Sequence, residues 1–484
     1  MAHRSGEARE QTTLFPVMLD ELVDEHALVR VIDAWVGCLN MHTLGFAKAQ
    51  AQVRGAPPYH PADLLKLYIW GYSSGSRSSR VLERECHTNV ECMWLLRRLA
   101  PDHKTIANFR SQNSDSLVAA CAAFVEFAGR HQLIKSKVVA IDGSKVRAVA
   151  SRKAVLYKEQ LHKQAQLNAQ EIAKYLEMLD AQDVHEEGAD VRRADLQKAL
   201  GELNARGEDI DQQVKQLTQV HRSSVVRTEP QAQPMPGFHG APGYNLQTAV
   251  EAQSHLIVHH HVCTDINDLR QLQPMAEAAA AVLHQACERG TQGGEDDKVV
   301  VTADRGYDNA SHLGELANQQ IITFVAPNRG LNPQGLFDRS AFVFDEERNQ
   351  YVCPGGKLLK CKKRSHAENP IAHYVAKAAD CTGCALKGQC TRGERRTVTR
   401  HIHEEAAQAN AERVAAHPEM LKLRRQVVEH PFGTLKHVIL GNARLLMRGI
   451  VGAKGELSLA VLAYNIKRVF SLRGGAWMTQ AARG

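Results

Sequence analysis

Two short apolar runs, KVVAIDGS at residues 137–144 and KVVVTADRG at residues 298–306, each end in an aspartate that a glycine follows within two residues. Runs of β-branched residues that stop at a turn predict buried strands. Strand-like and helical segments alternate after them, and this order predicts a mixed α/β sheet. Ligands bind beyond strand ends in such sheets, so Asp142 and Asp304 are candidates for one shared site. The alternative is a pair of ordinary turns, because aspartate and glycine are common turn residues.

The rest of the 484-residue chain predicts further domains, since this length exceeds one ordinary core. Leucines and other apolar residues recur at spacings of three and four between Leu196 and Leu217, a pattern typical of a helical seam. We interpret this insertion as an arm or a dimerisation element. The predicted parts are a helical N-terminal domain (1–130), a catalytic core (131–150 and 222–340), a helical hairpin or coiled-coil insertion (151–221), a cysteine-rich basic insertion (341–400) and C-terminal helices that complete the core (401–484).

The segment PDHKTIANFRSQNSD in the N-terminal domain offers Asp102 as the N-cap of a short helix. This helix carries Lys104, Asn108 and Arg110. Short helices with basic and amide side chains are typical of helix-turn-helix-like DNA-binding domains. A plain helical bundle is the alternative that the pattern leaves open.

The charge balance permits a polyanionic partner but does not require one. Lys and Arg number 60 against 53 Asp and Glu, which gives a net charge of +7. The sequence contains no apolar run long enough to span a bilayer and no signal-peptide pattern at its start, so we expect a cytoplasmic protein without a membrane partner. The cysteines number eleven, which argues against a disulfide framework.

Phosphodiester chemistry is well served by two Mg²⁺ or Mn²⁺ ions about 3.5–4 Å apart, held by carboxylates. Two aspartates leave such a pair under-coordinated, so a third acid is expected. Glu429 in RRQVVEHPFGTLKH is the candidate, because Arg425 and Lys436 lie on its helical face at spacings of four and seven. Pro431 then either kinks this helix or marks a fresh helical start. A solvated helix with an incidental ion pair is the alternative.

Together these segments resemble the DDE transposases of bacterial insertion sequences, in the branch with a Tyr-x2-Arg-x3-Glu-x6-Lys signature around the third acid. Arg425, Glu429 and Lys436 fit that signature, whereas Lys422 stands at the tyrosine position. The resemblance covers most of the chain, and the order of its fragments is more specific than any one of them. The fragments are HPADLLKLYIWGY, PDHKTIANFR, AIDGS, GYNLQTAVEA, VTADRGYDN, VEHPFGTLKH and LAYNIKR.

The resemblance implies an RNase H-like catalytic domain in which Asp142, Asp304 and Glu429 are the catalytic, Mg²⁺-binding acids. It implies metal-dependent hydrolysis at transposon ends, followed by transesterification of a 3′ hydroxyl into target DNA. Arg425 and Lys436 would contact the DNA backbone, and a homodimer or higher oligomer would assemble on double-stranded DNA near the nucleoid. Asp308 and Glu251 are less favoured rivals for the metal acids. The candidates for supporting or DNA contacts are Ser144, Lys145, Asn245 and Arg305.

Five cysteines lie within residues 353–390, and Cys381-x2-Cys384 has the spacing of a zinc knuckle. With Cys353 and Cys390 they would form a closed structural Zn²⁺ site, with Cys361 as a spare or substitute. Lysines and an arginine surround the cluster, so a zinc-ribbon-like insertion laid on DNA is the expectation. Free thiols are the alternative. The run HHH at residues 259–261 continues a strand pattern, so alternating exposure is favoured over metal binding.

Three functions remain in competition. The first is an active transposase that binds terminal inverted repeats, cuts at the ends and joins them to target DNA. The second is a catalytically silent, domesticated DNA-binding protein or repressor of the same fold. The third is a metal-dependent nuclease that releases cut ends without joining them.

Overall fold

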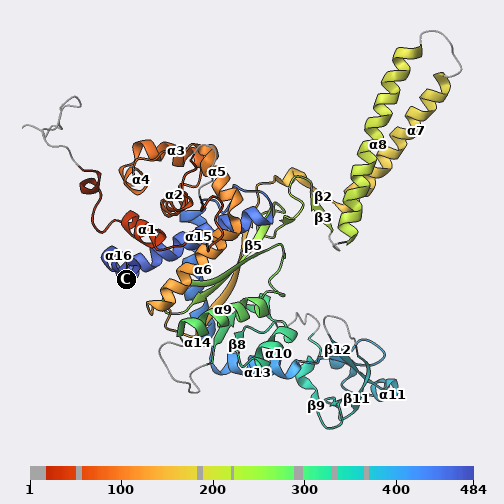
Figure 1. Ribbon diagram of the computed structural model, residues 1–484. Coiled ribbons are helices and arrows are strands. Elements are labelled where there is room, and N and C mark those ends of the chain that lie inside the picture. Colours follow the sequence, from red (N-terminus) through yellow and green to blue (C-terminus); the bar gives the residue numbers. More distant parts are fainter. Residues whose placement is uncertain are drawn as a thin grey trace, which may run out of the picture.

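The structure is a computed structural model that describes residues 18–50, 57–182, 189–219, 223–287, 298–328, 335–364 and 370–483. Figure 1 shows N-terminal helices packed beside a central sheet, a long two-helix arm that projects from one side, and a small β-rich lobe on another. None of the helices within these ranges is long and apolar enough to cross a membrane.

The central sheet is mixed, as the sequence predicts, and its main strand order is β6-β5-β1-β7-β8. The strands are β1 (Val138–Arg147), β5 (Pro242–Glu251), β6 (Ile257–Cys263), β7 (Val300–Ala303) and β8 (Ile322–Val325), and the two-residue β4 (Gln233–Pro234) also pairs with β5. Strands β6, β5 and β1 are antiparallel, whereas β1, β7 and β8 are parallel.

The pairing of β1 with β7 stops early, and this positions the first two acids. Strand β7 pairs with Val138, Val139 and Ala140 only, so Asp142 lies beyond the end of that ladder while it still pairs with Thr248 of β5. Asp304 follows β7 directly. The two apolar runs therefore lead to the same edge of the sheet, but the turn predicted after Asp142 is wrong, because β1 continues through Gly143 to Arg147.

Helices cover the sheet and extend it toward the C-terminus. They are α9 (Leu272–Cys287), α10 (Ala310–Asn318), α13 (Glu404–Ala416), α14 (Glu419–Gly433), α15 (Gly449–Arg473) and α16 (Gly475–Arg483). Helix α14 contacts β1, β5, β7 and β8 and includes Pro431, so proline does not start a new helix there. The helix continues directly as a π-helical segment, Thr434–Ile439, an irregularity that accompanies insertions in a helical ladder.

The N-terminal helices share one hydrophobic core with the sheet. They are α1 (Leu28–Gly37), α2 (Pro61–Ser73), α3 (Ser79–Thr88), α4 (Val90–Leu95), α5 (His103–Gln112) and α6 (Ser114–Arg130). Helix α2 is almost entirely buried, and α15 packs between it and α6 on one side and β6 on the other. Short 3-10 helices are found at Leu19–Leu22, Arg152–Ala154, Arg305–Tyr307 and Arg339–Ala341.

Two long helices, α7 (Lys158–Gln182) and α8 (Ala189–Gln219), lie side by side as the projecting arm in Figure 1. Strands β2 (Val155–Tyr157) and β3 (Ser224–Val226) pair at its base. Leu161, Ile210 and Leu217 are buried between the helices. The polar break that the sequence places between the helices lies in part, at residues 183–188, outside the described residues.

The region between β8 and α13 forms a second, five-stranded antiparallel sheet with the order β13-β12-β11-β10-β9. Its strands are β9 (Val343–Asp345), β10 (Gln350–Val352), β11 (Leu358–Arg364), β12 (Ile371–Ala376) and β13 (Thr397–His401), and two short helices, α11 (Ala378–Thr382) and α12 (Lys387–Cys390), precede β13. The aromatic rings of Phe344, Tyr351 and Tyr374 pack against one another in its core.

Candidate active site

Asp142 and Asp304, the two acids predicted at strand ends, meet across one arginine. Nη2 of Arg424, on α14, lies 2.7 Å from Oδ1 of Asp142 and 3.4 Å from Oδ2 of Asp304. The Asp304 side chain also caps the 3-10 turn that follows it, since its Oδ1 accepts a 2.8 Å hydrogen bond from the amide of Gly306. The structure thus brings together residues that lie more than a hundred positions apart in the sequence.

The electrostatics of this pair favour a bound cation. Burial raises the pKa of Asp142 to about 6; Arg424 opposes this shift, while the negative charges of Asp304 and Asp268 add to it. Like charges held close together disfavour ionisation of both groups, and a positive charge between them relieves that cost. The site is partly open, because the side chain of Asp304 is 45% exposed.

Asp268, in the loop before α9, is a third acid beside this pair that the sequence argument did not single out. Its Oδ1 accepts hydrogen bonds from Nζ of Lys145 at 3.0 Å, Nδ2 of Asn245 at 2.7 Å and Nε2 of Gln247 at 2.7 Å. Gln247 in turn accepts a hydrogen bond from the hydroxyl of the fully buried Tyr307, which follows Asp304 in the turn after β7. Asp268 therefore connects β1 and β5 to the segment that carries Asp304.

Asp142 and Asp268 approach the sheet edge from different faces. Successive residues of a strand point to opposite faces, so Asp142 and Lys145, three positions apart, point in opposite directions. Asp142 contacts α14 through Arg424, whereas Lys145 contacts the loop before α9. A side chain at Gly143 would clash with Asp268, because its Cβ would lie 2.7 Å from Oδ1 of that residue.

Glu429 lies on α14 like Arg424, but the structure does not bring it into the acid pair. Its side chain is exposed and forms no ion pair with any residue in the described ranges. Glu429 lies five positions after Arg424 on the helix, which turns their side chains about 140° apart around the axis. Within the described chain, no group of three or more His, Cys, Asp or Glu side chains has an arrangement that could hold a metal ion.

The two signature cations flank Glu429 differently. Arg425 is exposed. Lys436, in the π-helical segment, is close enough to Asp142 for the carboxylate to raise the pKa of its ammonium, although burial has the larger, opposite effect. Its Nζ lies 5.9 Å from the ring centre of Phe432. Lys422, at the tyrosine position of the signature, is exposed.

The two rival acids are occupied elsewhere. Glu251 is fully buried and accepts hydrogen bonds from the amides of Ser136 and Ser254 at 2.9 and 2.6 Å. Asp308 accepts a 2.7 Å hydrogen bond from the amide of Asn328. These contacts are typical of acids that tie loops together.

In the N-terminal domain, Lys104 and Asn108 are exposed on α5, and Asp102 caps that helix through the amides of Lys104 and Thr105. With Arg80 they line a pocket of about 470 Å³ between α3 and α5. Arg110 lines the same pocket, but only 6% of this residue is exposed. Its Nη1 donates hydrogen bonds to the hydroxyl of Tyr72 and to the carbonyl of Arg77, both at 3.2 Å. The guanidinium thus bonds groups of the N-terminal helices.

The cysteines gather in the small β lobe around a cavity of about 20 Å³ lined by Cys353, Cys381, Cys384 and Cys390. Burial raises the pKa of the Cys390 thiol, and its three neighbouring thiols act in the same direction. Cys361 does not line this cavity and lies in β11. The thiols converge without the geometry of a metal site among the described residues, and the fold around them is a five-stranded sheet, so a zinc ribbon is not supported.

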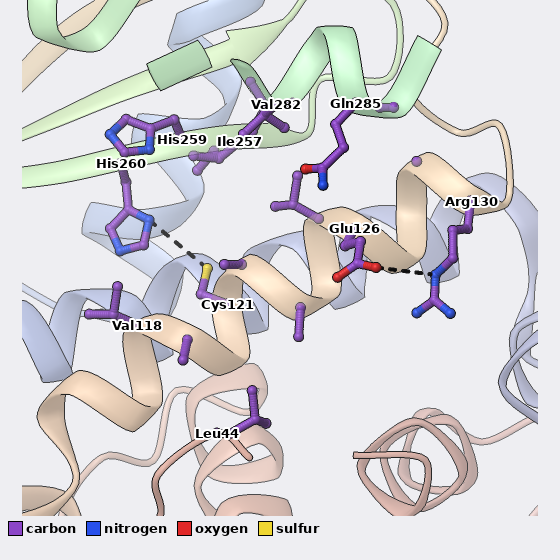
Figure 2. Close-up of a pocket in the computed structure, with 17 residues that line it drawn as sticks. Leu44, Val118, Cys121, Glu126, Arg130, Ile257, His259, His260, Val282 and Gln285 are labelled. Carbon is purple, nitrogen blue, oxygen red and sulfur yellow. Dashed lines mark hydrogen bonds and ion pairs between the residues drawn. The ribbon is translucent and has the colours of Figure 1, made fainter. Parts of the chain in front are cut away.

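The three consecutive histidines of β6 differ from the predicted alternation. His259 and His260 are partly buried, and His261 is exposed. The three residues pair in regular register with Gln247, Thr248 and Ala249 of β5, and the register shift of this strand pair lies just before them, between Ile257 and His259. Figure 2 shows His259 and His260 at an apolar pocket of about 460 Å³ between α6, β6 and α9, where Nδ1 of His260 lies 4.0 Å from Sγ of Cys121. This pocket contains none of the predicted catalytic residues.

The sequence argument missed Arg424, Asp268, Gln247 and Tyr307. Arg424 is adjacent to the signature residue Arg425, and the sequence alone does not indicate which of the two side chains points toward the sheet. Asp268 carried a weak signal, since the segment DIND follows the β6 strand and places two acids at a strand end. Lys145 and Asn245, expected as supporting residues, do lie in this network through Asp268.

Two families match the chain. The family described as "Transposase domain (DUF772)" matches residues 17–112, the part that includes Lys104 and Asn108. The family described as "Transposase DDE domain" matches residues 352–470, which include Arg424, Glu429 and the cysteines but neither Asp142 nor Asp304. No curated protein matches the sequence.

Proposed function

From its membership of the DDE transposases of insertion sequences, we propose that this chain binds the terminal inverted repeats of its element, cleaves the DNA at the ends and joins the 3′ hydroxyl to target DNA. Asp142, Asp304 and Glu429 are the proposed catalytic acids. The observation that carries the proposal is the convergence of Asp142 and Asp304 on one cationic group where the parallel pairing of β1 with β7 ends, beside the helix that bears Glu429. The matched DDE domain implies an RNase H-like fold, and the strand order supports it.

The donor set fits hard divalent cations. Asp142 and Asp304 already place carboxylate oxygens around the Arg424 nitrogen, and oxygen ligands of this kind suit Mg²⁺ or Mn²⁺. When bound, two such ions activate the attacking oxygen and stabilise the leaving oxygen. In this proposal Asp142 and Asp304 hold the ions, and Glu429, exposed on α14, is the third acid.

The remaining residues act on the DNA. Arg425, exposed on α14, and Lys436, near Asp142, are proposed to contact phosphates beside the cut. Lys104 and Asn108 on α5, with Arg80 of the same pocket, are proposed to contact the inverted repeat. Joining two element ends requires two active sites or the repeated use of one, so we propose a homodimer or larger assembly on double-stranded DNA in the cytoplasm.

The five-part division at residues 1–130, 131–150 with 222–340, 151–221, 341–400 and 401–484 is part of the same proposal. The arm and the β lobe then decorate a catalytic core that the C-terminal helices complete. The four converging thiols of the β lobe are proposed to bind one structural Zn²⁺ after a small rearrangement, because thiolates that share a cavity repel one another unless a cation joins them.

The test is end cleavage by the full-length chain with Asp142→Asn, Asp304→Asn or Glu429→Gln. Each variant should lose more than about 100-fold in cleavage rate, since the loss of an outer metal contact alone costs about 10- to 100-fold. Binding to an inverted-repeat duplex in a mobility-shift assay should persist. Asp308→Asn is the matched control, since this acid lies four residues from Asp304 and bonds a loop amide. Near-normal cleavage by any of the three variants would remove that residue from the site.

A joining assay separates the transposase from a nuclease of the same fold. Supplied with pre-cut ends and a plasmid target, the wild-type chain should form joined products. Release of cut ends without any joined product would favour the nuclease. Binding without cutting under all metal conditions would favour a silent DNA-binding protein.

A further inference from the structure

Arg424 contacts both catalytic aspartates through a single nitrogen. The distances of 2.7 Å to Asp142 and 3.4 Å to Asp304 both start at Nη2. A guanidinium that binds one carboxylate strongly uses two nitrogens in parallel, and Arg424 does not form such a fork here. Its charge therefore acts as a point charge between two carboxylates, which is how a divalent cation would act.

The rest of the Arg424 side chain is held weakly by polar contacts. Its Nε is buried and has no hydrogen-bond partner among the described residues. The side chain is 13% exposed, whereas that of Asp304 is 45% exposed, so solvent reaches the site from the Asp304 side. An ion can enter there without unfolding of α14.

We propose that Arg424 is a positioning residue that substitutes for the metal ions in the metal-free protein. It keeps Asp142 and Asp304 together against their mutual repulsion, and it leaves the carboxylates when divalent cations bind. This inference rests on the proposed function, because it takes Asp142 and Asp304 as metal ligands. It adds that metal binding competes with a cation of the chain itself.

The sign of the expected effect follows from this competition. In the wild-type chain, a divalent ion must displace the guanidinium before it can use both carboxylates. In Arg424→Gln the ion displaces nothing, and the unrelieved repulsion of the aspartates favours its entry. The variant should therefore bind Mn²⁺ about tenfold more tightly, as expected when one charge contact no longer competes. The metal-free variant should also melt at a lower temperature than the wild type.

Isothermal titration calorimetry of the DNA-free, full-length chain with Mn²⁺ measures the affinity, and thermal unfolding with and without Mn²⁺ gives the second readout. Mn²⁺ should raise the melting temperature of Arg424→Gln more than that of the wild type. Arg425→Gln is the matched control, since it removes the same charge from the neighbouring, exposed position. Its Mn²⁺ affinity should equal that of the wild type.

Three results would overturn the proposal. Arg424→Gln could bind Mn²⁺ no more tightly than the wild type, Arg425→Gln could gain the same affinity, or the melting temperature of Arg424→Gln could fall equally with and without Mn²⁺. The last result would mean a purely structural arginine. If Arg424→Gln does not fold, Arg424→Met, which keeps most of the length of the side chain but carries no charge, must still bind Mn²⁺ more tightly than the wild type.

Asp142→Asn in the same titration separates the two proposals. If this substitution weakens Mn²⁺ binding while Arg424→Gln leaves it unchanged, only the role of Arg424 is wrong. If Asp142→Asn leaves Mn²⁺ binding intact, Asp142 is not a metal ligand and the proposed catalytic site is wrong as well.

Discussion

Gln247 donates a 2.7 Å hydrogen bond from Nε2 to Oδ1 of Asp268, and its own Oε1 accepts a hydrogen bond from the hydroxyl of Tyr307. This bridge crosses from the loop before α9 to the turn after β7. Gln247 and Tyr307 are fully buried, so neither contact can be replaced by bulk water. Buried polar groups that lose a partner cost stability and leave their neighbours free to move.

We expect Asp268→Ala to lower end cleavage about 10- to 100-fold, because outer partners orient the groups that hold a metal. Binding of the inverted-repeat duplex should not change. Asp265→Ala removes the same charge from the same loop but leaves all three contacts of Asp268 intact, and it should cleave at the wild-type rate. Equal losses in both variants, measured by end cleavage under identical metal conditions, would contradict a specific role for Asp268.

The N-terminal pocket offers a test that separates DNA contact from folding. Lys104→Ala should weaken binding of the duplex and reduce the slope of log affinity against log salt by about one, as expected for one lost phosphate contact. Its melting temperature should not change, since Lys104 is exposed.

Arg110→Ala should behave in the opposite way. It removes a buried guanidinium that bonds Tyr72 and the Arg77 carbonyl, so the melting temperature should fall. Loss of a buried partner of this kind costs about 1–3 kcal/mol. If Arg110→Ala keeps its melting temperature but loses DNA binding, Arg110 contacts DNA after all. Mobility-shift assays at several salt concentrations, combined with thermal unfolding, make both measurements.

The thiol cluster predicts a metal content. Chain purified without chelator should release roughly one equivalent of Zn²⁺ when its thiols are modified, as a four-thiolate structural site requires. Cys384→Ser should release much less, while Cys361→Ser should match the wild type because Cys361 does not line the cavity. A zinc-free wild-type chain with reactive thiols would instead establish free cysteines.

The histidines of β6 predict a pH dependence of stability. Burial lowers the pKa of His260 to about 3 and that of His259 to about 4, below the ordinary value of 6.5. The unfolded chain then takes up these protons first, so each histidine contributes full stability above about pH 6.5 and loses it as the pH falls toward 4. Near pH 5 each proton accounts for about 1.4 kcal/mol per pH unit.

His260→Gln should therefore flatten the fall in melting temperature between pH 6.5 and pH 4, since Gln keeps a hydrogen-bonding group toward Ser458 but does not titrate. Melting temperatures of the wild type and the variant across this range provide the measurement. Parallel curves for the two proteins would show that His260 is not held neutral in the folded state.

The apolar runs before Asp142 and Asp304 could be predicted as strands from the sequence because a buried strand needs a continuous run of apolar residues, but the predicted turn after Asp142 was wrong, since β1 continues to Arg147. The side chain of Arg424, which joins these acids, could not be predicted from the sequence. Arg424 and Arg425 are adjacent, and which of them points inward depends on the rotation of α14. Burial of Val427 and Val428 against the sheet sets that rotation, and only the folded structure reveals it.

Other differences have equally local causes. Lys104 and Asn108 are four residues apart and share an exposed helical face, whereas Arg110, two residues later, is buried although it lines the same pocket. The five-stranded sheet of the β lobe was not predicted, because its core is formed by a few aromatic residues such as Tyr351 and Tyr374 and its strands lack long apolar runs. Glu429 remains a prediction, because its side chain is exposed and lies apart from the pair that Arg424 joins.

The stem of the arm also affects how the molecule can change. Val155 pairs with Val226 and Tyr157 with Ser224, so the two ends of the arm are held together by one short antiparallel strand pair where the arm joins the rest of the protein. The arm beyond this strand pair can be lengthened, shortened or replaced at little entropic cost while the spacing of its two ends stays the same. We therefore expect that a short turn, a longer helical hairpin or a fluorescent reporter domain can replace α7 and α8 without disturbing the sheet edge at Asp142.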